Sequence, residues 1–133
     1  MTTTTVAPVT EDEEFQQLGE RLLRSAKSDR DKAGVQALVE EETLLATARV
    51  RAVLVTEAGG KPRCHWESML GRQYTLGLDD ASRSFLALVL SMVGIGQTSL
   101  AAVQELDERR LAIILRAIAR LAGNDTLAVG TRL

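Results

Sequence analysis

Aromatic residues and cysteines are scarce in this chain. Only 3% of its 133 residues are aromatic, although 45% are hydrophobic. The core must therefore be built from Leu, Val, Ile and Ala, a composition typical of packed helices. The single cysteine, Cys64, permits no intramolecular disulfide. Because the first residues carry neither a basic leader nor an apolar segment, we expect a cytoplasmic protein.

The chain also lacks a strong net charge and a long apolar run. Its formal net charge of -2 excludes a protein-wide basic field, so any contact with nucleic acid would be local. The longest apolar run, FLALVLSMVGIG at residues 85–96, is shorter than the roughly 20 residues that span a bilayer. We therefore expect no membrane partner and interpret this run as part of the core.

Residues with catalytic chemistry are few and poorly arranged. The only histidine, His65, directly follows Cys64, and adjacent residues on a strand point to opposite faces. With Glu67 they would give a zinc ion at most three ligands. The acidic runs, including residues 40–42, are expected to be mostly solvated. We therefore expect no enzyme, cofactor or small-molecule substrate; a deep pocket around Cys64, His65 and Tyr74 would reopen the enzyme hypothesis.

Helical periodicity begins after a Thr-rich stretch. Residues 1–11 predict a flexible tail, and residues 12–133 a single helical domain. A first helix is expected from Asp12 to about Ser28, and a second from Asp29 to about Ala46. The alternation of apolar and polar residues then predicts a β-hairpin at about residues 48–67, with its turn at Gly59 and Gly60. A competing interpretation extends the second helix to Glu57.

The C-terminal half predicts helices throughout. Asp79 or Asp80 caps a helix at residues 80–93 that is apolar on nearly every side, and such a helix must be surrounded by other elements. A short helix follows from Ser99 to Leu106, and Asp107 caps the last helix, which ends at Gly123. The expected fold class is therefore mainly α (α+β), with about five helices around a central apolar helix. The alternative is an all-α bundle.

The last helix, DERRLAIILRAIARLAG, has two distinct faces. At about 100° per residue, one arc should pack on the central helix; it consists of Leu111, Ile114, Leu115, Ile118 and Ala122. Roughly opposite lies a basic stripe with one apolar residue: Arg109, Ile113, Arg116 and Arg120. This stripe is either solvated or a self-association surface, where arginine stems pack and acidic residues of another subunit pair with the guanidinium groups.

Two resemblances add further alternatives. TSLAAVQEL followed by DERRLAIILRAIARLAG resembles the two helices of a helix-turn-helix, with NDTLAVGTRL as a strand or wing, although Asp107 and Glu108 would repel phosphates. Residues 127–130, LAVG, resemble the short C-terminal peptides by which cargo proteins dock inside encapsulin shells. Arg132 departs from that pattern, because it separates Thr131 from the final apolar residue, Leu133.

The sequence thus predicts a protein whose function resides in its surface. We expect a non-enzymatic interaction or regulatory protein that self-associates, with Arg109, Ile113, Arg116 and Arg120 as the partner-binding residues. The partner would be a second copy or another protein. The alternative is a DNA-binding regulator of winged helix-turn-helix type that uses Arg116 and Arg120.

Overall fold

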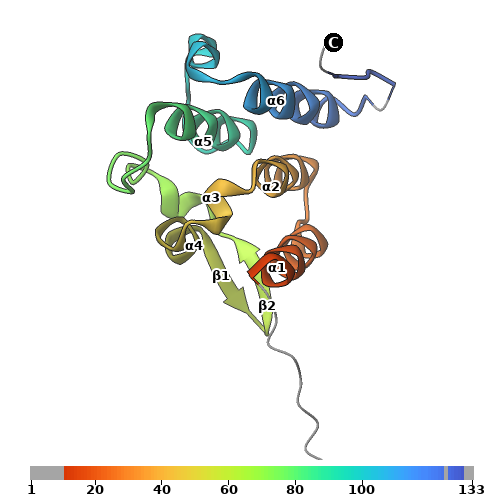
Figure 1. Cartoon of the computed structure of the whole chain (residues 1–133). Helices are drawn as coiled ribbons and strands as arrows, with labels where there is room; N and C mark the ends of the chain where they lie inside the picture. Colours follow the sequence, from red (N-terminus) through yellow and green to blue (C-terminus); the bar gives the residue numbers. More distant parts are fainter. Residues whose placement is uncertain (1–10, 125, 131–133) are drawn as a thin grey trace, which may run out of the picture.

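The computed structural model describes residues 11–124 and 126–130. Its α-helices are α1 (Glu11–Ser25), α2 (Asp29–Glu41), α3 (Thr43–Ala46), α4 (Ala48–Leu54), α5 (Asp80–Met92) and α6 (Glu108–Leu121). Two strands, β1 (Val55–Ala58) and β2 (Lys61–Cys64), and two 3₁₀ helices, η1 (Trp66–Met69) and η2 (Leu100–Glu105), complete these elements. In Figure 1, α5 and α6 lie at one end of the molecule, α2 lies beside them, and the hairpin lies at the opposite end.

The expected fold class, mainly α with a small β-hairpin, is confirmed. The strands β1 and β2 pair antiparallel, with Val55 opposite Cys64 and Ala58 opposite Lys61. Gly59 and Gly60 form the turn with φ angles of 60° and 75°, a conformation that residues with a Cβ rarely adopt. The alternative of an all-α bundle is therefore wrong.

The hairpin was expected to start at about residue 48, but it starts at Val55, because a short helix occupies residues 48–54. Residues 48–54 form α4, whose buried side chains, Val50 and Leu54, lie four residues apart as on one helix face. Ala52, which a strand would place on the same face as both, is exposed. Burial of one helical face, with α4 packed against η1, overrides the alternating pattern of the sequence. The competing interpretation of one helix as far as Glu57 is wrong as well, because the chain turns twice before α4.

The first of these turns follows Glu41, the last residue of α2. Glu42 adopts a φ of 74° and donates its N–H to the Leu38 carbonyl, so the helix stops there and does not continue to Ala46. The short α3 then begins at Thr43, and Thr47 separates it from α4. The first helix is also shorter than expected, since α1 ends at Ser25 and not near Ser28. Ser28 caps the second helix, α2, which begins at Asp29 as predicted.

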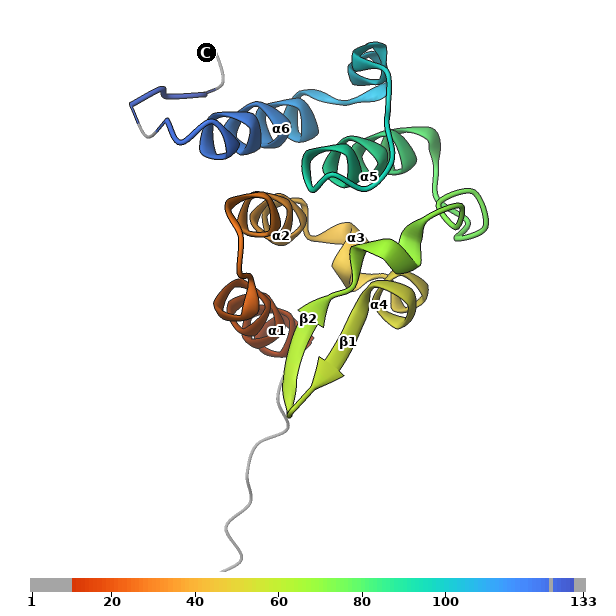
Figure 2. The same cartoon turned by 180° about the vertical axis from the view of Figure 1, so that it is seen from behind.

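The apolar helix α5 is largely buried, as predicted, but it lies at one end of the molecule and not at the centre of the fold (Figure 1). It contacts α2, α6 and η2, and Phe85, Leu86 and Val89 have no exposed surface. Asp79 caps it by accepting a hydrogen bond from the Ser82 backbone N–H at 2.8 Å. Figure 2 shows the same arrangement from behind, with α2 between the α5 and α6 pair and α1.

The core continues from the α5 region into the N-terminal half. One cluster of buried side chains draws on helices from α1 to α6 and includes Leu22, Leu38, Leu54, Trp66 and Ile114. The flexible tail predicted for residues 1–11 lies outside the described residues, apart from Glu11, with which α1 begins. Among the described residues, no helix is both long and apolar enough to cross a membrane.

Candidate interaction surface

The last helix, α6, has well-defined ends that fix its position along the chain. Asp107 accepts a hydrogen bond from the Arg110 backbone N–H at 2.8 Å, and its second carboxylate oxygen lies 2.9 Å from an Arg110 nitrogen. At the other end, Gly123 has a φ of 72°. The Gly123 N–H donates to the Arg120 carbonyl and the Asn124 N–H to the Ala119 carbonyl, both at 2.9 Å. These two hydrogen bonds form the usual left-handed helix end, as predicted.

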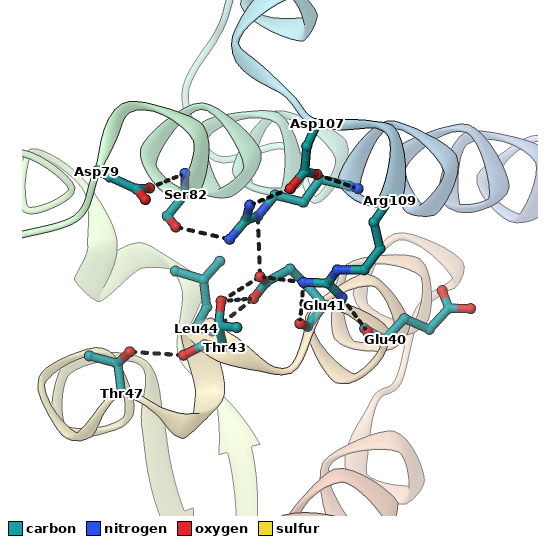
Figure 3. Close-up of polar contacts among 10 residues, drawn as sticks. Glu40, Glu41, Thr43, Leu44, Thr47, Asp79, Ser82, Asp107 and Arg109 are labelled. Carbon is teal, nitrogen blue, oxygen red and sulfur yellow. Dashed lines mark hydrogen bonds and ion pairs between the residues drawn. The ribbon is translucent and has the colours of Figure 1, made fainter.

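Glu41 is the polar centre against which α6 packs (Figure 3). Its side chain is completely buried, so the expectation that residues 40–42 are solvated is wrong for Glu41. One carboxylate oxygen accepts the Leu44 backbone N–H at 2.8 Å, and the Thr43 hydroxyl donates to both oxygens. The turn at Glu42 places the start of the next helix, α3, beside Glu41, so that the Glu41 carboxylate caps this start.

Two arginines of α6 reach the same carboxylate. Arg109 lies with a terminal nitrogen 3.3 Å from Glu41 Oε2 and 3.0 Å from the Glu41 carbonyl oxygen. Arg110 places its Nε 3.2 Å from Glu41 Oε2, and a terminal nitrogen donates to the Ser82 hydroxyl at 3.3 Å. Arg110 is the better shielded of the two, with a side chain 13% exposed against 50% for Arg109. A buried negative charge is thus neutralised by paired and hydrogen-bonded cations.

The remaining arginines of α6 pair with the neighbouring acid, Glu40. Arg116 Nε lies 3.4 Å from one carboxylate oxygen, and Arg120 places its two terminal nitrogens 3.1 and 3.3 Å from the two oxygens. These pairs are partly exposed, with the Glu40 side chain 22% exposed. We call the ion pairs of Glu40 and Glu41 with Arg109, Arg110, Arg116 and Arg120 the α2–α6 clamp.

The clamp corrects the expected orientation of α6. Ile113 is only 1% exposed, so it cannot belong to a surface stripe, and the arginines around it face α2 of the same chain. The acidic partner expected on another subunit is therefore supplied by Glu40 and Glu41. The four residues predicted to bind a partner do lie together, but along an internal helix contact.

The opposite face of α6 is apolar and points outward. Leu115 and Ile118 are each 43% exposed, Ala122 is exposed and Leu111 is half-buried. Of the arc that was expected to pack on α5, Ile114 is buried as predicted. Between residues 111 and 122 the only charged side chains are those of Arg116 and Arg120, both of which pair with Glu40. We call Leu111, Leu115, Ile118 and Ala122 the outer stripe.

The segment after α6 lies beside its last turns. Asn124 Oδ1 accepts the backbone N–H groups of Thr126 and Leu127 at 2.9 and 3.0 Å, which bends the chain back. An open groove of about 660 Å³ separates the two, lined by Arg116, Ala119, Arg120, Gly123, Asn124, Leu127, Ala128 and Val129. Leu127, the first residue of the encapsulin-like peptide, is 65% exposed, and residues 131–133 lie outside the described residues.

The helix-turn-helix resemblance is not matched by the local structure. Its first helix corresponds to η2, a six-residue 3₁₀ helix capped by Ser99. The described residues of its expected wing, 126–130, form no strand. The two arginines expected to contact DNA, Arg116 and Arg120, are the clamp residues paired with Glu40.

Cys64, His65 and Tyr74, around which a deep pocket would reopen the enzyme hypothesis, do not line one common hollow. Burial, and after it the negative charge of Asp31, raise the pKa of the Cys64 thiol to about 12. His65 is exposed and lies 4.0 Å from Glu67, whereas Tyr74 lines a separate hollow beside Arg83 on α5. Among the described residues, no group of three or more His, Cys, Asp or Glu side chains is arranged to hold a metal ion.

Comparisons with protein families, curated proteins and solved structures found no match to this chain.

Proposed function

We propose that this protein is a non-enzymatic interaction protein that self-associates through the outer stripe of α6. The observation that carries this proposal is a second, exposed apolar face on α6, in addition to the buried one. A surface helix normally turns its charges to solvent and its apolar residues inward. Here Ile113, Ile114 and Ala117 face inward and the arginines pair with α2, yet Leu115 and Ile118 are each left 43% exposed.

The spacing of the outer stripe favours a second copy of the chain as the partner. The intervals Leu111, Leu115, Ile118 and Ala122 are four, three and four residues, so they read the same in both directions. An antiparallel α6 from another chain would place Leu115 opposite Ile118 and the large Leu111 opposite the small Ala122. Such self-complementarity is what a two-fold interface requires.

The charges at the start of α6 favour the antiparallel orientation. Asp107 and Glu108 both lie at this end of the helix. A parallel pair would bring these carboxylates of the two chains together, and like charges in contact are destabilising. An antiparallel pair keeps them at opposite ends of the interface.

We expect the dimer to be weak. α6 has 14 residues, which corresponds to a length of about 21 Å. One seam between two helices of this length lies near the lower limit of specific interfaces, about 1,000 Å² in total. Dissociation constants in the micromolar range follow from such an interface.

Light scattering coupled to size exclusion, from low to high micromolar concentration, tests this proposal. We expect the average mass of the wild type to rise toward that of a dimer, and the double variant Leu115→Glu/Ile118→Glu to stay monomeric. Leu70→Glu is the matched control, because Leu70 is 57% exposed and lies outside α6. A wild type that stays monomeric throughout, or a control that is as disruptive as the double variant, would refute the proposal.

A further inference from the structure

Four cations without a carboxylate partner lie on α1 and β2, at the end of the molecule opposite α6. Arg21 and Arg24 lie on α1, and Lys61 and Arg63 on β2; all four are exposed. None of them forms an ion pair with a carboxylate of the described residues. The arginines of α6, in contrast, are all held by acidic partners.

Packing of α1 against β2 brings Arg21, Arg24 and Lys61 together, and Arg63 follows on the same strand beside a neighbouring hollow. An Arg21 terminal nitrogen donates to the Gly60 carbonyl at 2.8 Å and ties the helix to the hairpin turn. A hollow of about 290 Å³ is lined by Arg21, Arg24, Ser25, Gly60, Lys61 and Pro62. Lys61 and Arg63 are two residues apart on one strand and so share a face. We call Arg21, Arg24, Lys61 and Arg63 the basic ridge.

The tip of the hairpin lies at the end of the molecule away from α6 (Figures 1 and 2) and is held on one side by α1. A Cβ added at Gly59 or Gly60 would meet no atom within 4 Å. The outer side of the turn is therefore open to a large partner, and duplex DNA presents closely spaced phosphates to such a basic surface. Contacts from these basic residues to phosphates would carry no sequence information.

The side chains around the ridge discriminate between classes of polyanion. Single-stranded nucleic acid is bound mainly by stacking bases on exposed aromatic rings. Trp66, which follows the hairpin, is buried, and α1 contributes only Phe15, at its opposite end. A membrane-inserting tip would need large apolar residues, whereas this one reads Ala58, Gly59, Gly60 and Lys61.

We propose that the basic ridge binds the phosphodiester backbone of duplex DNA without regard to base sequence. This site is distinct from the helix-turn-helix considered above, since it uses the hairpin and α1 and leaves the clamp intact. It is also independent of the outer stripe, which lies at the other end of the molecule (Figure 1). With about four phosphate contacts, log affinity should fall with log salt concentration with a slope of about −4.

Fluorescence anisotropy with a short labelled duplex, at about 50 mM and about 200 mM salt, tests the basic ridge. We expect Arg24→Glu/Lys61→Glu to weaken binding about tenfold or more and to reduce the salt slope to about −2. Neither residue makes a side-chain hydrogen bond with a described residue, so the fold should persist; circular dichroism checks this.

The matched control is Arg49→Glu/Arg51→Glu, which makes the same charge change at exposed positions of α4. We expect it to retain most of the affinity. Three results would overturn the proposal: no binding at low salt, equal loss in both double variants, or tighter binding to single strands, anionic lipid vesicles or polyglutamate than to the duplex. Retention of duplex binding by Leu115→Glu/Ile118→Glu would show that the two surfaces act separately.

Discussion

Replacement of Glu41 by alanine should be among the most destabilising single changes in this protein. The substitution removes a fully buried carboxylate that accepts the Leu44 N–H and pairs with Arg109 and Arg110. It leaves the well-shielded Arg110 guanidinium with only Asp107 and Ser82 as partners, and it leaves the buried Leu44 N–H without an acceptor. Breaking a buried pair by removing one partner destabilises proteins by about 3–5 kcal/mol.

The other members of the clamp should follow in an order set by their exposure. Glu41→Gln keeps an acceptor for Leu44 and loses only the charge, so we expect about 1.5–3 kcal/mol. Arg109→Ala should lose less than about 1 kcal/mol, because half of that side chain is exposed and its ion pair is screened by water. Arg110→Ala should lie between Arg109→Ala and Glu41→Ala.

Urea unfolding followed by circular dichroism measures these differences. A chain of 133 residues is expected to unfold with about 7–20 kcal/mol, so all these variants should remain folded in water. With a denaturant dependence of about 2 kcal/mol per molar urea, Glu41→Ala should lower the unfolding midpoint by about 2 M. A loss of unfolding free energy below about 1 kcal/mol in Glu41→Ala, or a larger loss in Arg109→Ala than in Glu41→Ala, would refute our account of the clamp.

Two further predictions concern side chains near α2: those around Gly34, and the Cys64 thiol near Asp31. Gly34→Ala should destabilise the fold by about 1–3 kcal/mol, measured by thermal unfolding, because its Cβ would lie 2.5 Å from a Val93 methyl carbon and 3.1 Å from the Trp66 ring. The Cys64 thiol, with its pKa raised to about 12 from 9.0 by burial and then by Asp31, should react with a disulfide reagent at pH 8 far more slowly in the folded than in the urea-unfolded protein. Because the unfolded thiol ionises first, stability should also fall as pH rises above 9; equal reaction rates in both states would contradict this.

Features decided by local chemistry were predictable from the sequence. The caps Asp79 and Asp107, the Gly59–Gly60 turn and the left-handed end at Gly123 each depend on a few neighbouring residues. The burial of α5 was predictable as well, because a helix that is apolar on nearly every side has no stable exposed orientation.

Features decided by contacts between distant residues were not predictable in the same way. Residues 48–54 alternate as a strand would, and only their packing makes them helical. The burial of Glu41 depends on the turn at Glu42, a non-glycine residue with a positive φ. No sequence pattern indicated this turn. The one available signal was charge complementarity, since the acidic run of α2 matches the basic stripe of α6.

The rotation of α6 about its own axis is the clearest case, and magnitudes explain it. Turning the helix to bury Leu115 and Ile118 would expose Ile113 and Ala117, so one set of apolar groups would replace another for a gain of about 1–2 kcal/mol. The same rotation would withdraw Arg110 from Glu41 and leave a buried carboxylate uncompensated, which costs about 3–5 kcal/mol. The clamp therefore fixes the orientation of α6, and exposure of the outer stripe is its direct consequence.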